Sequence, residues 1–446
     1  MFSTIKNAFK IPDLRKKIYF TILMLIIFRF GAHIPVPGLS ADAMKQFLGG
    51  GGLDLFSMFD AFTGGAFSSA TVMALGVSPY INASIIIQLL TVAIPALERL
   101  AKEGAEGRKK INKITRVTGI VLAFVQGAGL YVTLHNMGVE NPGLNPIANE
   151  GWQSFFLIVL TFVAGTAFIM WLGELITEKG LGNGISMIIY AGIVSSIPSG
   201  ILAIYKQYLA PGAFSFKGVA ISAAILVVAI LAITLVVLFN TAERKIPVQY
   251  AKRVVGRKMY GGQSTNIPIK VVSGGVMPII FASSIMAFPA TIVRLVTGGQ
   301  IPQTGIWNTV LGCLSAGLSK IWWTYLVYSV LYFLLIIFFT YFYSSIQFNP
   351  IELANNMKKS GGYIPGYRPG KPTSDFIGKV SSRLNFAGAL FLGVIAVLPI
   401  VAGALFGIQG LQIGGTSLLI MEGVALETVQ QLESQMVMRH YKGFLE

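Results

Sequence analysis

The sequence has little of what most enzymes and metal proteins need. It contains one cysteine, Cys313, and three histidines in 446 residues. An internal disulfide needs two cysteines, and a zinc site needs several cysteines or histidines at close spacing. His33, His135 and His440 lie more than 100 residues apart from one another. The sequence therefore excludes an internal disulfide and a cysteine-based metal site, and it predicts no metal or other cofactor.

The motifs of common catalytic sites are also missing. The sequence has no GxxxxGK[ST] phosphate-binding loop, no HExxH zinc motif and no GxSxG nucleophile motif. We also find no plausible catalytic triad. The chain is therefore not expected to hydrolyse nucleotides or to act as an enzyme, and any energy that drives its function must come from a partner.

Charged residues are scarce. They make up 12% of the chain, against roughly 25% in soluble domains, while 54% of the residues are hydrophobic. A transmembrane helix needs about 20 apolar residues to cross ~30 Å of hydrocarbon. Ten runs fit this requirement, which predicts an all-α integral membrane protein with ten transmembrane helices: 18–36, 72–95, 114–137, 152–173, 183–205, 217–240, 271–293, 319–346, 380–405 and 416–438.

The positive charges set the expected orientation. Ten spans place both chain ends on one side, and that side holds 28 of the 34 lysines and arginines. The positive-inside rule makes that side cytoplasmic. We therefore expect a short cytoplasmic segment at 1–17 and a cytoplasmic tail at 439–446. Residues 18–36 are interpreted as a retained first span, because no small-x-small cleavage site follows them.

Two of the cytoplasmic loops, 241–270 and 347–379, are longer than a connection requires. Both are basic, and the second is rich in glycine and proline. Long charged loops often carry function, so we expect them to dock a partner with acidic patches or RNA phosphate. The alternative is that they serve only to set the topology. The candidate docking residues are Arg244, Lys245, Lys252, Arg253, Arg257, Lys258, Lys358, Lys359 and Arg368.

The chain contains an internal repeat. Residues 76–86 (GVSPYINASII) and 275–285 (GVMPIIFASSI) agree at seven of eleven positions, and 184–189 matches 415–420 more weakly. In the topology given by the charges, both matched pairs of spans run antiparallel. This pattern is typical of an inverted repeat of two five-helix halves, with a pathway where the halves meet. Chance similarity between apolar segments is the alternative.

The spans carry few ionisable residues. Arg29 lies late in the first span and is expected to extend outward, and Glu422 and Glu427 lie in the last span. A proton- or ion-coupled transporter usually has acid–base partners at mid-membrane, and an intramembrane enzyme needs a catalytic set. The repeated segments instead offer aliphatic side chains, which can form a dewetted constriction in a pore.

Residues 53–70 precede the second span and are amphipathic, but Gly64 and Gly65 interrupt them. They are too broken to cross the membrane as a helix. We expect a re-entrant helix that lines or blocks a cavity, where irregular backbone is tolerated. An interfacial helix outside the membrane is the alternative.

Long stretches of this sequence resemble the SecY/Sec61-alpha family, the channel subunits of protein translocons, and the resemblance covers essentially the whole chain in order. The first span ends in the family's IPVPG run at 34–38. The other matching segments are 76–92 (GVSPYINASIIIQLLTV), 182–187 (GNGISM), 248–269 (VQYAKRVVGRKMYGGQSTNIPI), 275–289 (GVMPIIFASSIMAFP), 348–370 (FNP, NNMKKSGG and PGYRPG) and 414–420 (GGTSLLI).

The resemblance implies a channel with a central pore between a first half at 18–205 and a second half at 206–438. Residues 53–70 would be a plug, and a lateral gate would open between spans 2 and 3 on one side and 7 and 8 on the other. The family would have an apolar residue shortly after its pore ring in the last span, and this chain has Glu422 there instead. By position, the family's pore ring would consist of Val77, Ile81, Ile185, Ile189, Ile280 and Ile420.

The same resemblance implies the function and the partners. The chain would let unfolded polypeptides with a signal sequence cross a bacterial plasma membrane, and would release apolar segments sideways into the lipid bilayer. The two basic loops would dock the SecA ATPase or the ribosome. SecE would clamp the two halves, and SecG would be peripheral.

Overall fold

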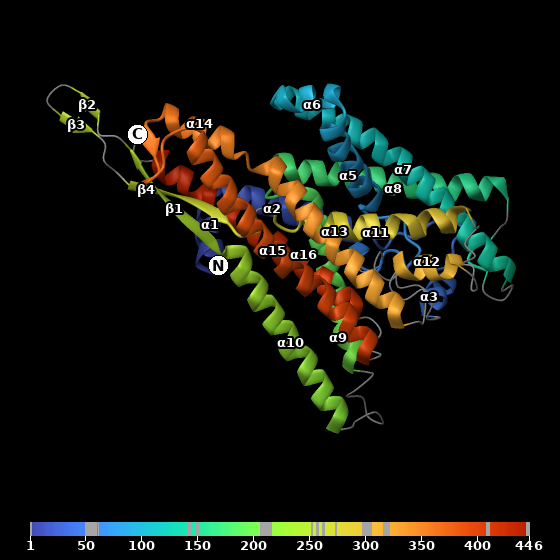
Figure 1. The fold of residues 1–446 in the computed structure, drawn as a ribbon. Helices are drawn as coiled ribbons and strands as arrows, with labels where there is room; N and C mark the ends of the chain where they lie inside the picture. The colour runs from blue at the N-terminus through green and yellow to red at the C-terminus, as the bar shows by residue number, and fades with distance from the viewer. Residues whose placement is uncertain are drawn as a thin grey trace.

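The computed structural model describes residues 2–49, 60, 62–140, 145–148, 151–205, 216–250, 253–255, 258–260, 264–272, 274–296, 306–314, 322–406 and 411–442. Long helices dominate it (Figure 1). Up to residue 205 the helices are α1 (Phe2–Lys10), α2 (Pro12–Gly31), α3 (Ala41–Gly49), α5 (Ser78–Ala93), α6 (Pro95–Lys102), α7 (Ala105–Glu140), α8 (Trp152–Lys179) and α9 (Gly184–Ile204). After it come α10 (Phe216–Thr241), α11 (Met277–Val296), α12 (Ile306–Leu314), α13 (Trp322–Gln347), α14 (Pro350–Lys359), α15 (Lys371–Phe406) and α16 (Leu411–Lys442).

Each of the ten predicted spans coincides largely with one long helix: α2, α5, α7, α8, α9, α10, α11, α13, α15 or α16. Among the described residues, six helices are long and apolar enough by themselves to cross a membrane, or seven if α5 and α6, which meet at a bend of 100°, count as one. Helices α2 and α16 fall short because the first half of α2 and the second half of α16 carry many polar and charged residues. The prediction of a helical membrane protein with several spans is confirmed.

The sequence marks several helix starts. Pro12, Pro79, Pro95 and Pro350 occupy the first turns of α2, α5, α6 and α14, where a proline lacks no needed N–H. Asn183 caps α9, since its Oδ1 accepts a hydrogen bond from the Ile185 backbone N–H at 3.1 Å. These local signals fix the residues at which the spans begin.

The structure adds β strands that the sequence analysis did not predict. Strand β1 (Glu243–Tyr250) pairs antiparallel with β4 (Ser264–Lys270) and with β5 (Gly362–Tyr363), in the order β4-β1-β5. A separate hairpin joins β2 (Arg253–Val255) to β3 (Lys258–Tyr260). The two long basic loops are therefore joined by β1–β5 pairing. Ile246 and Val248 of β1 are buried against Met357, Ile364 and Ile377, which gives this region a small core of its own.

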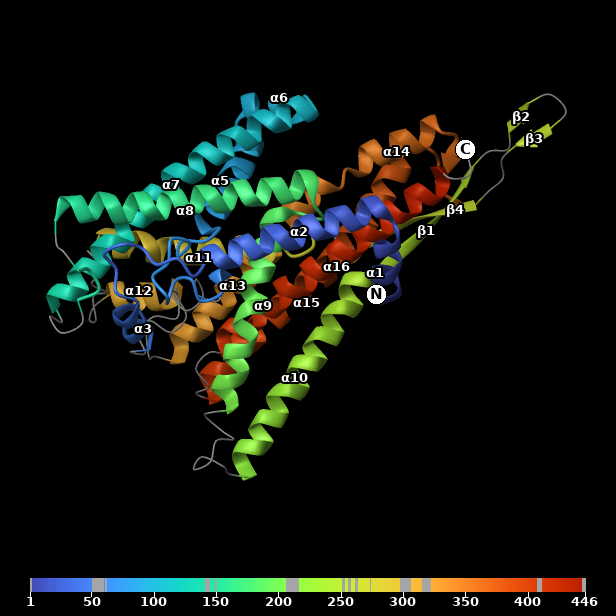
Figure 2. The same ribbon diagram turned by 180° about the vertical axis from the view of Figure 1, so that it is seen from behind.

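The chain ends and the strands gather at one end of the molecule. Figures 1 and 2 show the N and C labels, β1 to β4 and α14 at this end, and α3 and α12 toward the opposite end. Many helix faces are apolar and exposed, most clearly on α10, where Leu226, Val227 and Leu231 are each more than half exposed. Such faces suit a lipid environment, in which apolar side chains lose nothing by exposure.

Residues 62–77 connect to α5 mainly through turns, so they contain less helix than predicted for 53–70. Phe62 and Thr63 are helical, and the helix ends at Gly64. Residues 53–59 and 61 of the predicted plug lie outside the described residues. Val36 donates a backbone hydrogen bond to Ala70 at 2.9 Å, and Val72 donates one to Ile34 at 3.0 Å. These two bonds bind the segment to the IPVPG run that follows α2.

Candidate functional site

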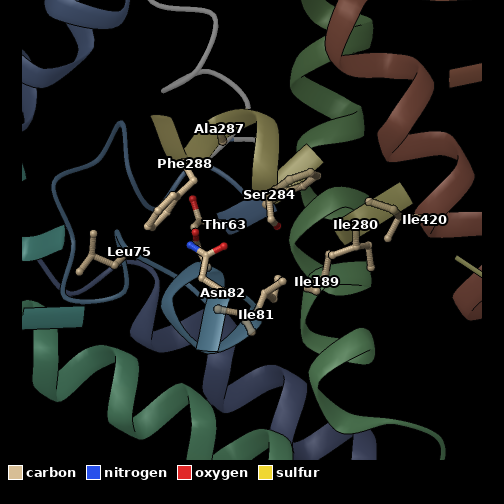
Figure 3. A pocket seen from close by; sticks show the side chains of 13 residues that line it. Thr63, Leu75, Ile81, Asn82, Ile189, Ile280, Ser284, Ala287, Phe288 and Ile420 are labelled. Atoms are coloured by element: carbon tan, nitrogen blue, oxygen red, sulfur yellow. The ribbon is translucent and has the colours of Figure 1, made fainter. Parts of the chain in front are cut away.

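A cavity lies where α5, α9, α11 and α16 meet (Figure 3). Aliphatic side chains dominate its wall, and none of the lining residues is an acid or a base. They are Phe62, Thr63, Leu75, Val77, Ser78, Ile81, Asn82, Ile189, Ile280, Ser284, Ala287, Phe288 and Ile420. Such a wall offers few fixed hydrogen bonds, so it cannot select a solute by charge.

The repeated segments place two of the lining elements in the same way. Gly76 and Gly275 both adopt left-handed backbone conformations, with φ of +56° and +58°. Each is followed by a valine, and a helix then begins beside a proline. Ile81 and Ile280 each fall on the first turns of these helices and reach the cavity from α5 and α11. The sequence match therefore extends to the backbone geometry.

Five of the six residues predicted for the ring line this cavity. Ile189 and Ile420 join Val77, Ile81 and Ile280, and Ile420 is only 1% exposed. Ile185 does not line the cavity. It packs on Gly173 of α8, where the Cβ atom of any larger residue would lie 2.5 Å from the Ile185 Cδ1 atom. Glycine at 173 leaves a notch that holds Ile185, and the sequence pattern of α9 gives no sign of it.

The polar residues of the cavity were not among the site residues predicted from the sequence. Asn82 on α5 and Ser284 on α11 both line it, and Thr63 joins them from the segment before α5 (Figure 3). Asn82 directly follows the predicted ring residue Ile81, and a polar side chain at that place in an apolar span was an available signal. Together with Ser78, these side chains add hydrogen-bonding groups to an otherwise apolar wall.

Glu422 is buried near the ring residue Ile420 but does not line the cavity. Its Oε2 accepts a hydrogen bond from Asn240 Nδ2 of α10 at 2.9 Å. Its Oε1 has no hydrogen-bond partner among the described residues. The glutamate at this position thus serves a contact between α16 and α10, and it adds no charged group to the wall of the cavity.

We expect Asn240→Ala to lower the free energy of unfolding by about 1–3 kcal/mol. The substitution removes the hydrogen bond to Oε2, so that neither oxygen of the buried Glu422 carboxyl has a partner among the described residues. Adding Glu422→Leu should recover part of that loss, since the unsatisfied group is then gone. Thermal unfolding of the purified protein in detergent measures both. Equal stability of Asn240→Ala and the parent chain would contradict this interpretation.

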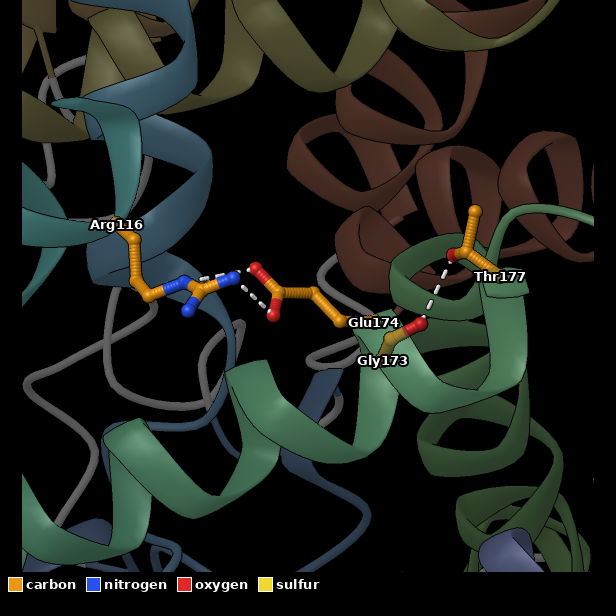
Figure 4. A network of polar contacts seen from close by, with 4 residues as sticks. All are labelled: Arg116, Gly173, Glu174 and Thr177. Atoms are coloured by element: carbon orange, nitrogen blue, oxygen red, sulfur yellow. Dashed lines mark hydrogen bonds and ion pairs between the residues drawn. The ribbon is translucent and has the colours of Figure 1, made fainter. Parts of the chain in front are cut away.

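An ion pair joins α7 to α8 beside the site (Figure 4). Arg116 holds Glu174 through two bonds, from Nε to Oε1 at 2.9 Å and from Nη2 to Oε2. One turn further, Thr177 donates to the Gly173 carbonyl at 2.9 Å and accepts from the Gly184 backbone N–H at 2.9 Å. These contacts fix the turn between α8 and α9, and so the start of the helix that carries Ile189.

The candidate docking residues lie at the end of the molecule that holds the strands. Arg244, Lys245, Lys358, Lys359 and Arg368 are all exposed. Arg253 and Lys258 belong to the β2–β3 hairpin, while Lys252 and Arg257 lie outside the described residues. Lys245 Nζ lies 3.4 Å from Glu243 Oε1, and this ion pair is exposed to solvent. Because β1 pairs with β5, residues from both loops share one basic surface.

Comparisons with known proteins agree with this architecture. The SecY family profile matches residues 71–429. The "Protein translocase subunit SecY" of Streptomyces galbus is 44% identical over 451 residues, covering 100% of both chains. A SecY structure described by its plug domain, which stabilises the closed translocation channel, aligns with a TM-score of 0.66 and 21% identity over 95% of this chain and 92% of that one. Sec61 in a canine ribosome–channel complex aligns with a TM-score of 0.61 and 18% identity, over 95% and 93%.

The helical spans and the apolar cavity between them therefore define a multi-pass membrane channel. The chain belongs to the SecY family, and it is a protein-conducting channel subunit of a translocase. Its function is transport without chemical catalysis.

Proposed function

We propose that the cavity between α5, α9, α11 and α16 is the constriction through which an unfolded polypeptide passes. The observation that carries this proposal is the meeting of Val77, Ile81, Ile189, Ile280 and Ile420 at one cavity without any charged side chain. An aliphatic ring excludes water and ions when closed, and it can surround side chains of any chemistry when a chain fills it. Ile185 belongs to the predicted ring, and its role there remains a prediction.

The channel opens sideways between α5 and α7 on one side and α11 and α13 on the other. The contacts of α11 with both α5 and α7 support this choice, because they are the helix–helix packing that a sideways opening would break. A signal sequence would separate these helices. An apolar segment of about 20 residues would then leave for the lipid, which is its better solvent. The two five-helix halves, 18–205 and 206–438, would move apart as units.

Partners supply the driving energy from the basic surface. We assign docking of the SecA ATPase or the ribosome to the candidate residues on the two loops, with Arg368 exposed between β5 and α15. SecE would hold the halves together, and SecG would lie at the periphery. The membrane would be a bacterial plasma membrane, with residues 1–17 and 439–446 in the cytoplasm. The basic excess around the strands supports this orientation.

A covalent lock across the cavity tests the proposal. Cys313 is the sole cysteine, so Cys313→Ser gives a clean background for the pair Asn82→Cys and Ser284→Cys, which face the cavity from α5 and α11. We expect a short bismaleimide linker to lower translocation of a secretory precursor at least about tenfold, because the two helices can no longer separate. A long flexible linker should restore it. Full translocation with the short linker in place would contradict the proposal.

A further inference from the structure

The segment before α5 reaches into the cavity. Phe62 and Thr63 line it together with Val77, Ile81 and Ile280. The residues that follow form a compact turn on Asp60. The Gly65 backbone N–H donates to the Asp60 carbonyl at 2.9 Å, and the Ser68 N–H donates to Asp60 Oδ1 at 2.7 Å. These bonds tie the turn together, so the contacts that attach it to the spans also position Phe62 and Thr63 in the cavity.

Arg29 of α2 makes one of these attachments. Its Nη1 donates a hydrogen bond to the Gly64 carbonyl oxygen at 2.6 Å, across 35 positions of sequence. This side chain was expected to extend outward, and the bond to Gly64 gives it a specific partner that the sequence did not indicate. An arginine within a span needs a polar partner. Here that partner is the carbonyl directly after Phe62 and Thr63, so the bond acts on the part of the segment that fills the cavity.

The same segment also lies against α9. A Cβ atom on Gly64 would come within 2.8 Å of the Gly192 carbonyl oxygen and 2.2 Å of Ser195 Oγ. A Cβ atom on Gly192 would come within 2.1 Å of the Phe62 carbonyl oxygen. Both positions need glycine at this close approach. Residues 62–64 therefore contact both α2, through the Arg29 guanidinium, and α9, through the Gly192 backbone.

We propose that Arg29 is a positioning residue that keeps the channel closed, by binding the Gly64 carbonyl and so holding Phe62 and Thr63 in the cavity. The proposal rests on the proposed role of this cavity as the constriction. A polypeptide that enters the cavity must displace Phe62 and Thr63, and this displacement breaks the bond to Arg29. Opening is then coupled to the arrival of the substrate.

Ion efflux tests the role of Arg29. The full-length chain with its co-purifying subunits is reconstituted into vesicles loaded with chloride, without a precursor. A hydrogen bond from a charged donor changes an equilibrium constant by roughly ten- to hundredfold. We expect Arg29→Gln to raise chloride efflux per folded channel by about that factor, and Arg29→Lys to raise it less, because lysine keeps the charge and a donor. A stalled precursor that fills the pore should suppress the added efflux.

Gly64→Ala and Gly65→Ala form a matched pair. Both residues have left-handed backbones, with φ of +67° and +85°, so alanine strains both. Only at Gly64 does the new Cβ strike α9, whereas at Gly65 the nearest atom is Ser68 Oγ at 3.9 Å. We expect Gly64→Ala to raise chloride efflux per folded channel as Arg29→Gln does, and Gly65→Ala to keep it at the parental level.

Parental efflux from both Arg29→Gln and Gly64→Ala would overturn the proposal, as would equal leakage from Gly64→Ala and Gly65→Ala. Thermal unfolding of each variant separates leakage from misfolding, because a purely structural role for Arg29 would lower stability without raising efflux per folded channel. Crosslinks from Ile81 to a stalled precursor distinguish a failure of the role proposed for Arg29 from a failure of the role proposed for the cavity. If these crosslinks form while channels with Arg29→Gln show parental efflux, the role proposed for Arg29 is wrong and the role of the cavity as the constriction is retained.

Discussion

Ile280→Asn is expected to open the channel to ions and to precursors with defective signal sequences. Ile280 is 6% exposed and contributes its side chain to the cavity from α11. An amide in place of this aliphatic group lets water occupy the constriction, and the closed state then loses a dry contact worth about 2 kcal/mol. We expect chloride efflux from vesicles, and export of a precursor with a disabled signal sequence, to rise by roughly tenfold or more.

Ile285→Asn is the matched control for this substitution. Ile285 lies on the same helix and is partly buried, but it does not line the cavity. We expect it to change stability without relaxing the dependence on the signal sequence. Ile280→Leu should keep the parental behaviour, because it preserves the aliphatic wall. If Ile280→Asn leaves both chloride efflux and the dependence of export on the signal sequence at the parental level, Ile280 does not belong to the constriction.

Arg368→Glu is expected to uncouple the channel from its cytoplasmic partner. The side chain is exposed between β5 and α15, and its own backbone carbonyl accepts a hydrogen bond from Thr373 Oγ1 at 2.8 Å. That backbone contact does not depend on the side chain, so the loop should keep its shape. Reversing the charge at a docking contact replaces attraction by repulsion and costs several kcal/mol at a close interface. We expect partner-driven translocation to fall at least about tenfold.

Lys379→Glu makes the same change of charge at another position, on α15. We expect it to have a small effect that disappears at higher salt, as for a distant surface charge. Parental thermal stability of Arg368→Glu would show that the fold is intact. Equal losses from Arg368→Glu and Lys379→Glu would mean that net charge, and not a docking contact at Arg368, governs the partner's binding.

The spans were predictable because lipid imposes one simple demand, a long apolar run, and each of the ten runs lies largely in a helix. The repeat was readable because Gly76 and Gly275 stand before two similar helix starts. The strands were missed for a physical reason. Only Ile246 and Val248 of β1 are buried, and this short alternation is hidden among charged residues.

The details of the site depend on contacts that no local pattern encodes. Ile185 does not line the cavity, and it packs in the space that Gly173 leaves on another helix. Arg29 binds Gly64 because the chain folds back across α2, and Glu422 pairs with Asn240, which lies 182 positions earlier. Sequence spacing predicts the face of a single helix, whereas these partners are set by how several helices pack together.

Site-specific photocrosslinking from the ring tests the central claim most directly. A photoreactive residue is placed at Ile81 or Ile280, in membranes that hold a secretory precursor stalled during transfer, with Leu231 on the exposed face of α10 as the control position. We expect adducts to the mature part of the precursor from Ile81 and Ile280 that require its signal sequence, and none from Leu231. Absence of precursor adducts at both ring positions, while positions outside the membrane give them, would contradict a polypeptide-conducting constriction at this cavity.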